Sequence, residues 1–352
     1  MKNDYREQLD HLYFSQEQKA QMVDRLLHTQ AQPAAPCRQR APLRRITVIG
    51  IAAALVFTMG AGATVVYNKL ASEAFSGVFG TAQTEIVDKI GRPIGASATS
   101  NGVTITADAI IGDKYHYAIT YTIQKDDGTA FDFDPADVVN GKYLPLMFGE
   151  WDTDIGWNSG SHGSSYFYDA DPNDNAIQYV EMMETGEKLT HRTAKAKFKN
   201  LRLLTENENR VIAEGKWSLK FDLNFEDASI SLPAGQTMDL HGMAATIDEI
   251  TLSPIALRVD YTVDEEVQWD EQAESGRVSE HDREQMLRYF ESVSIILTKT
   301  DGTTIDLSNA GGGVKPRNGK TICQKGSVFE EIVPLEEIDH ITVNGIEIPV
   351  HN

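Results

Sequence analysis

Cysteine is almost absent from this chain, and its scarcity excludes two kinds of small stabilised fold. The 352 residues contain only Cys37 and Cys323. A disulfide scaffold needs several cysteine pairs and a cysteine-rich zinc site needs a cluster of thiolates, so neither is expected. Proline and glycine occur in ordinary numbers, 12 and 27, which excludes a collagen-like or wholly disordered chain.

Sequence motifs for catalysis are also missing. The chain has no G-x-S-x-G nucleophile motif, no P-loop and no G-x-G-x-x-G dinucleotide motif. The segment that starts at His281 resembles the inverted zinc motif H-x-x-E-H, but Gln285 replaces the second histidine. We therefore predict no enzyme activity, no cofactor and no metal site.

One acidic segment resembles the start of a calcium-binding loop. Asp169, Asp171, Asn173 and Asn175 alternate as they do at the start of an EF-hand. The sixth position is Asp174 where glycine is required, and the twelfth is a valine where glutamate is required. The pattern favours a turn, with a weak calcium site as the alternative.

Positive charge is scarce as well. The chain has 32 Lys and Arg against 52 Asp and Glu, a net charge of −20 at pH 7. Because phosphate contacts need clustered basic side chains, we predict no nucleic-acid partner. Hydrophobic residues make up 41 % of the chain, enough for a substantial core, and the length suggests two or three domains.

The longest apolar segment has the length of a membrane span. Residues 46–67, ITVIGIAAALVFTMGAGATVVY, include no charged residue. As a helix they would extend ~33 Å, enough to cross a hydrocarbon core of ~30 Å, so we predict a transmembrane helix. A cleaved signal peptide is the alternative, because Ala61-Gly62-Ala63 resembles a cleavage site. The preceding region is too long for that, and the apolar run exceeds the usual ~7–15 residues.

Basic residues set the predicted orientation of this span. Arg38, Arg40, Arg44 and Arg45 precede it, and only Lys69 follows closely. By the positive-inside rule, the N-terminus is cytoplasmic and the C-terminal region is extracytoplasmic. Residues 1–45 then carry a net charge of +3 and residues 68–352 carry −23. The predicted location is the cell membrane, with the inner tail close to anionic lipid.

Small residues repeat along the predicted span. Gly50, Ala54, Thr58 and Gly62 are spaced four residues apart and lie on one side of a helix. Such a stripe lets two membrane helices approach closely, which predicts a homodimer. The alternative is that small residues are simply common in membrane helices.

The first 30 residues read as a short helical segment, followed by a linker at residues 31–45. Ser15 and Gln18 form a capping-box pattern at the start of the second helix. Two helices this small cannot bury their apolar faces alone, so we expect them to dock on a partner. A self-packed hairpin and a helix lying on the bilayer remain alternatives. The predicted docking residues are Leu9, Leu12, Met22, Val23, Leu26 and Leu27.

The outer region is mainly β in pattern, and we divide it into an α+β domain at residues 68–195 and one or more β domains at residues 196–352. A helix is expected at residues 81–90, ended by Gly91, and another at residues 279–290, capped by Ser279. Alternation from Trp217 to Phe225 predicts a strand with one buried face. Asn344-Gly345 predicts a hairpin turn, and Cys323 is expected to be buried. Tandem β-sandwich-like domains follow from this spacing.

Aromatic residues are concentrated in a segment that we interpret as a long loop, residues 147–175. They are Trp151, Trp157, Tyr166, Phe167 and Tyr168. Aromatic rings with glycine and serine suit sugars or peptides of the cell wall, so this loop is a candidate ligand site. The alternative is that the rings cover the edge of the first β domain.

Residues 79–123, FGTAQTEIVDKIGRPIGASATSNGVTITADAIIGDKYHYAITYTI, resemble a family of Gram-positive membrane proteins named for a domain of unknown function, DUF4179. Residues 215–225 and 250–263 resemble the Ig-like domain that often follows it, and residues 5–27 are similar to the family's short cytoplasmic segment. Members are often encoded beside alternative sigma factors and are regarded as membrane-bound anti-sigma factors. The resemblance implies that residues 1–30 hold a sigma factor.

The tail departs from the zinc-binding type of anti-sigma domain. That type uses a His-x3-Cys-x2-Cys cluster, whereas this tail has only His11, His28 and Cys37 at unrelated spacings. The sequence thus predicts a single-pass membrane regulator with an outer sensing region. The alternative is an anchored envelope structural or cell-wall-binding protein with no regulatory role.

Overall fold

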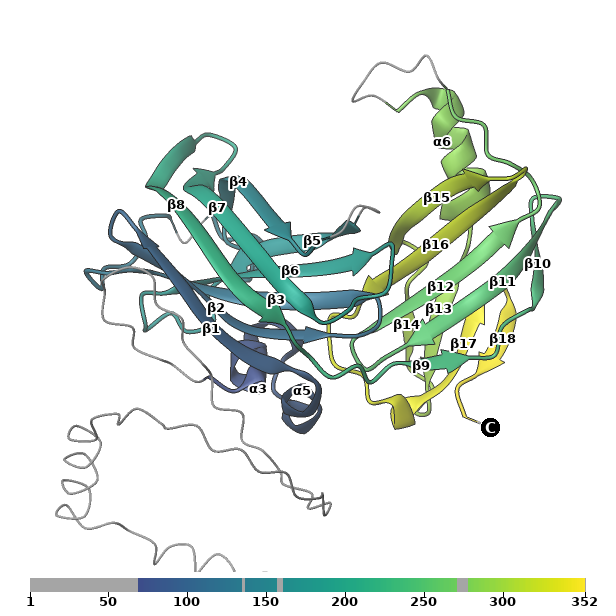
Figure 1. The fold of residues 1–352 in the computed structure, drawn as a ribbon, viewed down its shortest axis with the longest axis horizontal. Coiled ribbons are helices and arrows are strands. Elements are labelled where there is room, and N and C mark those ends of the chain that lie inside the picture. Colours follow the sequence, from purple (N-terminus) through teal and green to yellow (C-terminus); the bar gives the residue numbers. More distant parts are fainter. Residues whose placement is uncertain (1–68, 135–136, 157–160, 271–277, 352) are drawn as a thin grey trace, which may run out of the picture. The chain divides into compact units, whose positions relative to one another are not determined.

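The computed structural model describes residues 69–134, 137–156, 161–270 and 278–351, and all of them belong to one compact unit. Two β-sandwiches make up most of this unit (Figure 1). The mainly β class predicted from the sequence is confirmed. No helix within these ranges has the length and apolar character needed to cross a membrane, and the predicted span at residues 46–67 lies outside them.

Three short helices open the described chain: α3 (Ala71–Ala74), α4 (Ser76–Phe79) and α5 (Thr84–Ile90). The helix expected from residue 81 therefore starts three residues later. Gly91 ends the helix as predicted. A Cβ atom there would lie 2.8 Å from the Ala71 side chain and 2.8 Å from the Val87 carbonyl oxygen, so only glycine fits.

The first sandwich consists of a five-stranded and a three-stranded antiparallel sheet. The larger sheet has the order β1 (Arg92–Ser100), β2 (Val103–Gly112), β3 (His116–Lys125), β6 (Ile177–Thr185), β5 (Ser161–Tyr168). The smaller has the order β4 (Leu146–Asp154), β7 (Arg192–Leu204), β8 (Asn209–Leu223). Along β8, buried and exposed residues alternate as predicted, and the Trp217 indole donates to the Val103 carbonyl at 2.8 Å. This bond connects the two sheets inside their shared core.

Two predictions about this region are wrong. The expected domain boundary between residues 195 and 196 falls inside β7, which pairs with both β4 and β8. Because Ala194, Ala196 and Phe198 belong to the first core, the first sandwich extends to Leu223. The expected long loop at residues 147–175 is mostly two strands, β4 and β5.

The second sandwich pairs a six-stranded sheet with a four-stranded one. The six-stranded sheet has the path β10 (Thr237–Leu240), β11 (Met243–Leu252), β12 (Ala256–Val263), β16 (Lys320–Val328), β15 (Gly311–Arg317), with β9 (Ile230–Leu232) pairing β11. The four-stranded sheet has the order β14 (Thr304–Asp306), β13 (Ile295–Lys299), β17 (Ile338–Val343), β18 (Ile346–Pro349), and a 3-10 turn, Leu335–Glu337, precedes β17. Asn344 (φ 46°) and Gly345 (φ 82°) form the predicted turn between β17 and β18. Both are left-handed, as a type I′ hairpin requires.

A helix, α6 (Glu280–Met286), precedes β13 and continues as one π-helical turn, Leu287–Glu291. The predicted cap is confirmed, because the Ser279 hydroxyl accepts from the Asp282 amide at 3.1 Å. The helix ends against β16, where the fully buried Lys325 ammonium donates to the Phe290 and Val293 carbonyls at 3.0 and 2.8 Å. Cys323, on the same strand, is buried as expected.

The opening helices pack against both sandwiches in a separate core, which we call the helix core. On their side it contains Phe75, Val78 and Ile90, and it continues over Val180 of β6. Ile255, at the start of β12, belongs to the same core, as do Ala256 and Ile332. The segment directly after residue 68 is therefore packed where the two sandwiches meet.

Two glycines of β15 test how closely this strand packs on β16. A Cβ atom on Gly312 would lie 1.8 Å from the Gln324 carbonyl oxygen, whereas one on Gly313 meets only a side-chain oxygen at 3.8 Å. We expect Gly312→Ala to lower the free energy of unfolding by about 1–3 kcal/mol, because the strands must move apart. Gly313→Ala should stay within about 0.5 kcal/mol of wild type. Denaturant titration of the full chain measures both, and equal effects would contradict the close packing.

Candidate functional site

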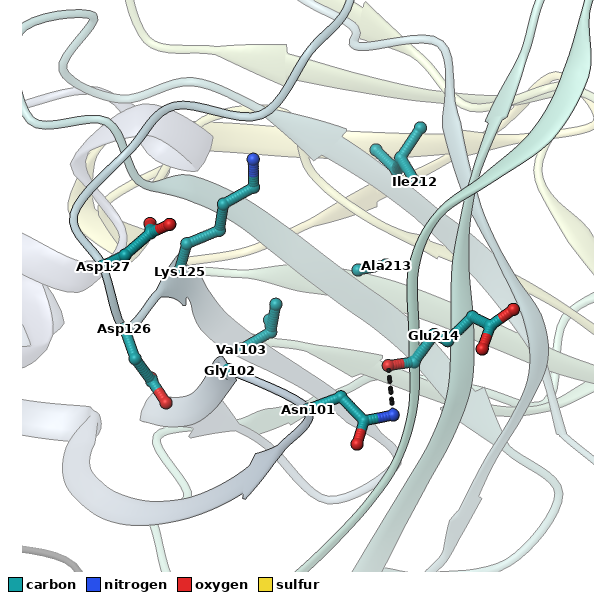
Figure 2. Close-up of a pocket in the computed structure, with 9 residues that line it drawn as sticks. All are labelled: Asn101, Gly102, Val103, Lys125, Asp126, Asp127, Ile212, Ala213 and Glu214. Carbon is teal, nitrogen blue, oxygen red and sulfur yellow. Dashed lines mark hydrogen bonds between the residues drawn. The ribbon is translucent and has the colours of Figure 1, made fainter.

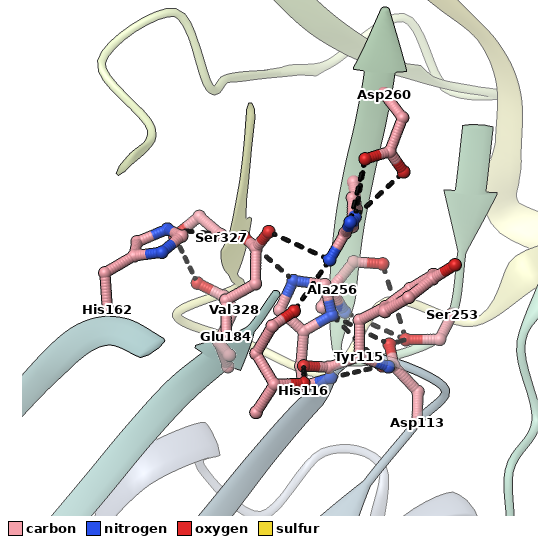
Figure 3. Close-up of polar contacts among 12 residues, drawn as sticks. Asp113, Tyr115, His116, His162, Glu184, Ser253, Ala256, Asp260, Ser327 and Val328 are labelled. Atoms are coloured by element: carbon pink, nitrogen blue, oxygen red, sulfur yellow. Dashed lines mark hydrogen bonds and ion pairs between the residues drawn. The ribbon is translucent and has the colours of Figure 1, made fainter. Parts of the chain in front are cut away.

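A group of charged side chains is buried where the two sandwiches meet (Figure 3). Charged residues are almost never fully buried unless they are paired, so such a group calls for a physical account. Four of its members, Asp113, His116, Glu184 and Arg258, expose 3 % of their surface or less. We call the whole set the junction cluster: Asp113, Tyr115, His116, His162, Glu184, Ser253, Arg258 and Asp260.

The turn between β2 and β3 fixes the first ion pair. One carboxylate oxygen of Asp113 accepts from the backbone amides of Tyr115 and His116 at 2.8 and 2.7 Å. The same oxygen lies 3.0 Å from Nδ1 of His116. Burial alone would raise the pKa of Asp113, but the charge and hydrogen bond of His116 and the hydroxyl of Ser253 lower it. Burial would lower the pKa of His116, but Asp113 and then Glu184 raise it to about 9. At neutral pH this pair is a carboxylate beside an imidazolium.

Glu184 lies between two histidines from the neighbouring strands. On β6 it is opposite His116 of β3 on one side and His162 of β5 on the other. Each histidine places Nε2 3.4 Å from the same carboxylate oxygen. Burial would raise the pKa of Glu184, but these two histidines lower it to about 2. Glycines in the second sandwich make room, because a Cβ on Gly326 would lie 2.8 Å from the Glu184 carboxylate and one on Gly311 2.6 Å from the His162 ring.

Arg258, on β12 of the second sandwich, reaches across to the first. Its guanidinium lies 3.8 Å from the ring centre of Tyr115 and donates to the Thr185 carbonyl at 2.7 Å. It also pairs with Asp260 at 2.8 Å and lies 3.5 Å from the second oxygen of Glu184. A planar guanidinium can stack on a ring with its face while its edge donates hydrogen bonds, whereas an ammonium has no planar face to stack.

The order of contacts in the junction cluster differs from that of a catalytic triad. The Ser253 hydroxyl donates to Asp113 at 2.6 Å, while His116 faces Glu184 with its other nitrogen. A serine nucleophile must instead contact the histidine, which takes its proton. Within the described ranges, no group of three or more His, Cys, Asp or Glu side chains could hold a metal ion. This geometry fits a joint between sandwiches better than a reacting centre.

A cavity of about 710 Å³ lies elsewhere, at one end of the first sandwich (Figure 2). Turn residues line much of it, including Asn101 and Gly102, whose φ values are 49° and 76°. Asn101 donates to the Glu214 carbonyl across the opening at 3.2 Å. Its acidic side chains, Asp126, Asp127 and Glu214, are exposed. Ligand sites use polar groups that converge inside an apolar cavity, so this cavity is a poor candidate.

The five aromatic residues predicted to form a ligand loop are not brought together as a set. Trp151 is on β4 and is 53 % exposed. Phe167 and Tyr168 are successive residues of β5 that point to opposite faces, into the first core and the helix core. Tyr166 is partly buried against the helix core, and Trp157 lies outside the described residues. The alternative, that rings cover the first β domain, fits Phe167 and Tyr168.

The structure also describes two segments that resemble metal-binding motifs. The Asp169 segment forms a turn, in which the Asp171 carboxylate accepts from the Asn173 amide at 3.0 Å. His281 is on the exposed surface of α6. The remaining predicted residues lie outside the described ranges, so those roles stay predictions: Leu9, Leu12, Met22, Val23, Leu26, Leu27, Arg38, Arg40, Arg44, Arg45, Gly50, Ala54, Thr58 and Gly62.

Sequence reasoning missed the junction cluster. Its signal was weak but present: Arg258 occupies a position inside the apolar strand IALRVDYTV, and His116 and Glu184 lie within strand patterns rich in buried residues. A charged residue within a run of buried positions needs a partner. The partners come from segments up to 143 residues apart, as Tyr115 and Arg258 are, and no local pattern indicates such a contact.

One family model matches part of the chain. Residues 43–125 match the model described as "Domain of unknown function (DUF4179)". The chain carries this domain. The match confirms the resemblance seen at residues 79–123 and does not extend to the Ig-like domain expected in the later part of the chain. No curated protein matches the chain. A structure described as "the conserved domain protein from Bacillus anthracis" is similar, with 16 % identity and a TM-score of 0.45, over 72 % of this chain and 76 % of that one.

The raised pKa of His116 predicts how the stability of the fold changes with pH. Since its pKa is about 9 in the fold and 6.5 as the ordinary value, its contribution is fully present below pH 6.5 and is lost as pH rises through 9. The change is about 3 kcal/mol, because each pH unit between the two pKa values corresponds to 1.36 kcal/mol. We expect the difference in unfolding free energy between wild type and His116→Gln to shrink by this amount between pH 6 and pH 10. Taking the difference cancels other groups, such as Lys325, whose pKa burial lowers to about 8.

The matched control is His191→Gln, a change at an exposed residue directly before β7. It should follow the wild-type pH profile throughout. A constant difference between wild type and His116→Gln would contradict a buried imidazolium at the junction.

Proposed function

We propose that this chain is a single-pass membrane regulator of the anti-sigma-factor type. In this proposal, the two sandwiches are extracytoplasmic, residues 46–67 cross the membrane, and residues 1–30 bind a sigma factor. The basic flank supports this orientation, because Arg38, Arg40, Arg44 and Arg45 precede the apolar segment and only Lys69 follows it closely.

The packing of the helix core carries the proposal. Helices α3 and α4 follow the apolar segment directly, and Phe75 and Val78 pack with Val180 of the first sandwich and Ile255 of the second. A movement of either sandwich therefore acts on the segment nearest to the proposed span. An envelope protein that is merely anchored needs no such contact and could use a plain linker.

The extent of the family match is consistent with this arrangement. Residues 43–125 include the apolar segment, helices α3 to α5 and strands β1 to β3. The family unit thus joins the proposed span to the first strands of the sandwich. It stops at the end of β3, so β4 to β8 complete the fold beyond the matched segment.

The junction cluster adds the rigidity that such a relay requires. Arg258 of the second sandwich contacts Tyr115, Thr185 and Glu184 of the first. Ser253 and Asp113 add a second link at 2.6 Å. Because the junction cluster holds the two sandwiches in one orientation, a shift that a ligand causes in either sandwich is passed on to the helix core.

Topology is tested by a reporter enzyme fused after Asn352. An alkaline phosphatase that is active only outside the cytoplasm should be active in this fusion, because the positive-inside rule places the C-terminus outside. Replacing Arg38, Arg40, Arg44 and Arg45 by Glu should reduce or invert the signal. An unmodified fusion that is produced but inactive would contradict the orientation.

The partner is tested with the full chain as bait in its native host. Leu26→Asp combined with Leu27→Asp places charge in the predicted apolar docking face and should abolish capture of a sigma factor. Ala31→Asp with Gln32→Asp adds the same charge in the linker and should leave capture unchanged. Equal capture by the first double variant and wild type excludes this face. No sigma factor with any bait favours the anchored structural protein.

A further inference from the structure

A buried carboxyl group lies outside the junction cluster, in the core of the first sandwich. Glu181, on β6, exposes 3 % of its surface. Its neighbours on the same face of the strand, Tyr179 and Met183, pack in the first core, whereas Val180 and Met182 face the helix core. A charge inside an apolar core is costly, so the free energy of this core depends on whether Glu181 carries its proton.

Glu181 has no basic partner among the described residues, unlike the carboxylates of the junction cluster. Asp113 contacts His116, and Glu184 contacts two histidines and Arg258. The ion pairs within the described ranges do not include Glu181, and its polar contacts are all with hydroxyl groups. A buried carboxylate without a cation bears the full loss of solvation, which favours the neutral, protonated form.

Three hydroxyl groups surround this carboxyl group. The Thr153 hydroxyl donates to both of its oxygens, at 3.1 and 2.8 Å, and the hydroxyls of Tyr121 and Tyr179 donate at 3.3 and 3.5 Å. Hydroxyls can donate or accept, so the same set can serve the neutral and the ionised carboxyl group. Thr153 is on β4, an edge strand of the small sheet, whereas Glu181 belongs to the large sheet. The contact therefore joins the two sheets.

The charge of Glu181 changes near neutral pH, and that of the neighbouring tyrosines does not. Burial raises the pKa of Glu181 from 4.5 to about 7, while hydrogen bonds from Thr153, Tyr121 and Tyr179 oppose this rise. Burial also raises the pKa of Tyr117, Tyr121 and Tyr179 far above the ordinary value, so these three side chains stay neutral.

Two other charged side chains lie near this part of the core. Asp152, exposed on β4, adds to the rise in the pKa of Glu181, because like charges repel each other. Arg192, at the start of β7, donates to the carbonyls of Ile155 and Gly156 at 3.2 and 2.8 Å, so its guanidinium faces backbone oxygens. On the facing side of this core, strands β7 and β8 add apolar side chains.

Solvent lies close to Glu181 on the side of β4 and β5, which are edge strands of the two sheets. Ser165 of β5 is opposite Glu181 in the sheet and is exposed. Opposed residues share a face, so the Ser165 side chain lies beside the carboxyl group. Trp151, two residues before Thr153 on the same face of β4, is 53 % exposed. A small separation of β4 from β5 therefore admits water to the carboxylate.

We propose that Glu181 is a proton-operated latch of the first sandwich. With its proton, the group stays in the core and holds edge strand β4 to the large sheet through Thr153. When the proton leaves to solvent, the carboxylate is stable only if water reaches it, and the β4 edge opens. Acid thus closes this edge and alkali opens it. The latch goes beyond the regulatory function proposed above and does not depend on it.

The test is hydrogen–deuterium exchange of the full chain in neutral detergent, read by mass spectrometry of peptides from β4. Because the pKa of Glu181 is about 7 in the closed form and 4.5 as the ordinary value, the latch is fully closed below pH 4.5 and is lost as pH rises through 7. We expect the protection of β4, corrected for intrinsic exchange, to fall by roughly tenfold or more between pH 5 and pH 8.

Two variants that cannot ionise should lack this response. Glu181→Gln keeps the hydrogen bonds, and Glu181→Met is an apolar side chain of similar length. The ratio of wild-type to variant protection cancels the titration of other groups and should fall as pH rises. The matched control, Glu187→Gln, removes the same charge at an exposed residue shortly after β6 and should respond as wild type does.

Three results would overturn the latch. A ratio that stays constant with pH would show that Glu181 does not control the opening. Loss of the response in Glu187→Gln as well would show that only net charge matters. An equal fall of protection in every strand of the first sandwich would show a change of global stability instead of an opening at β4.

Discussion

The contact of Arg258 with Glu184 and its neighbours determines how the two sandwiches are joined. Burial costs each of these ions several kcal/mol of solvation free energy, and a partner of opposite charge is needed to offset that cost. Only one orientation of the two sandwiches lets the guanidinium contact Glu184, the Thr185 carbonyl and the Tyr115 ring at the same time. Buried ion pairs add little net stability, because desolvation offsets their attraction. Their effect here is to favour one orientation of the two sandwiches over others.

That fixed orientation explains why the helix core can exist. Ile255 and Val180 come from different sandwiches and share one apolar core with Phe75. Their packing is favourable only while the junction cluster keeps the two sandwiches in this orientation. The apolar contact and the charged contact are therefore complementary: burial supplies the free energy, and the ion pairs supply the geometry.

Local features of this fold could be predicted, and features that join distant segments could not. The Trp217 strand, the Ser279 cap and the Asn344-Gly345 turn were all evident, because alternation, capping and left-handed turns depend on a few adjacent residues. The boundary at residues 195 and 196 was misplaced because β7 looks like the start of a new strand block until its pairing with β4 is known. The aromatic segment was misread as a loop because its glycines and serines belong to β5. The junction cluster depends on contacts such as Ser253 to Asp113, 140 residues apart.

Two buried basic residues of this acidic chain act in different ways, and their partners decide which. Arg258 is buried among carboxylates and positions one sandwich against the other. Lys325 is buried among carbonyl oxygens and ends the helix before β13, where the loss of water lowers its pKa to about 8. Both positions are complete without a ligand, because each cation already faces oxygen atoms of the chain. The first contact orients the two sandwiches, and the second closes the end of a helix.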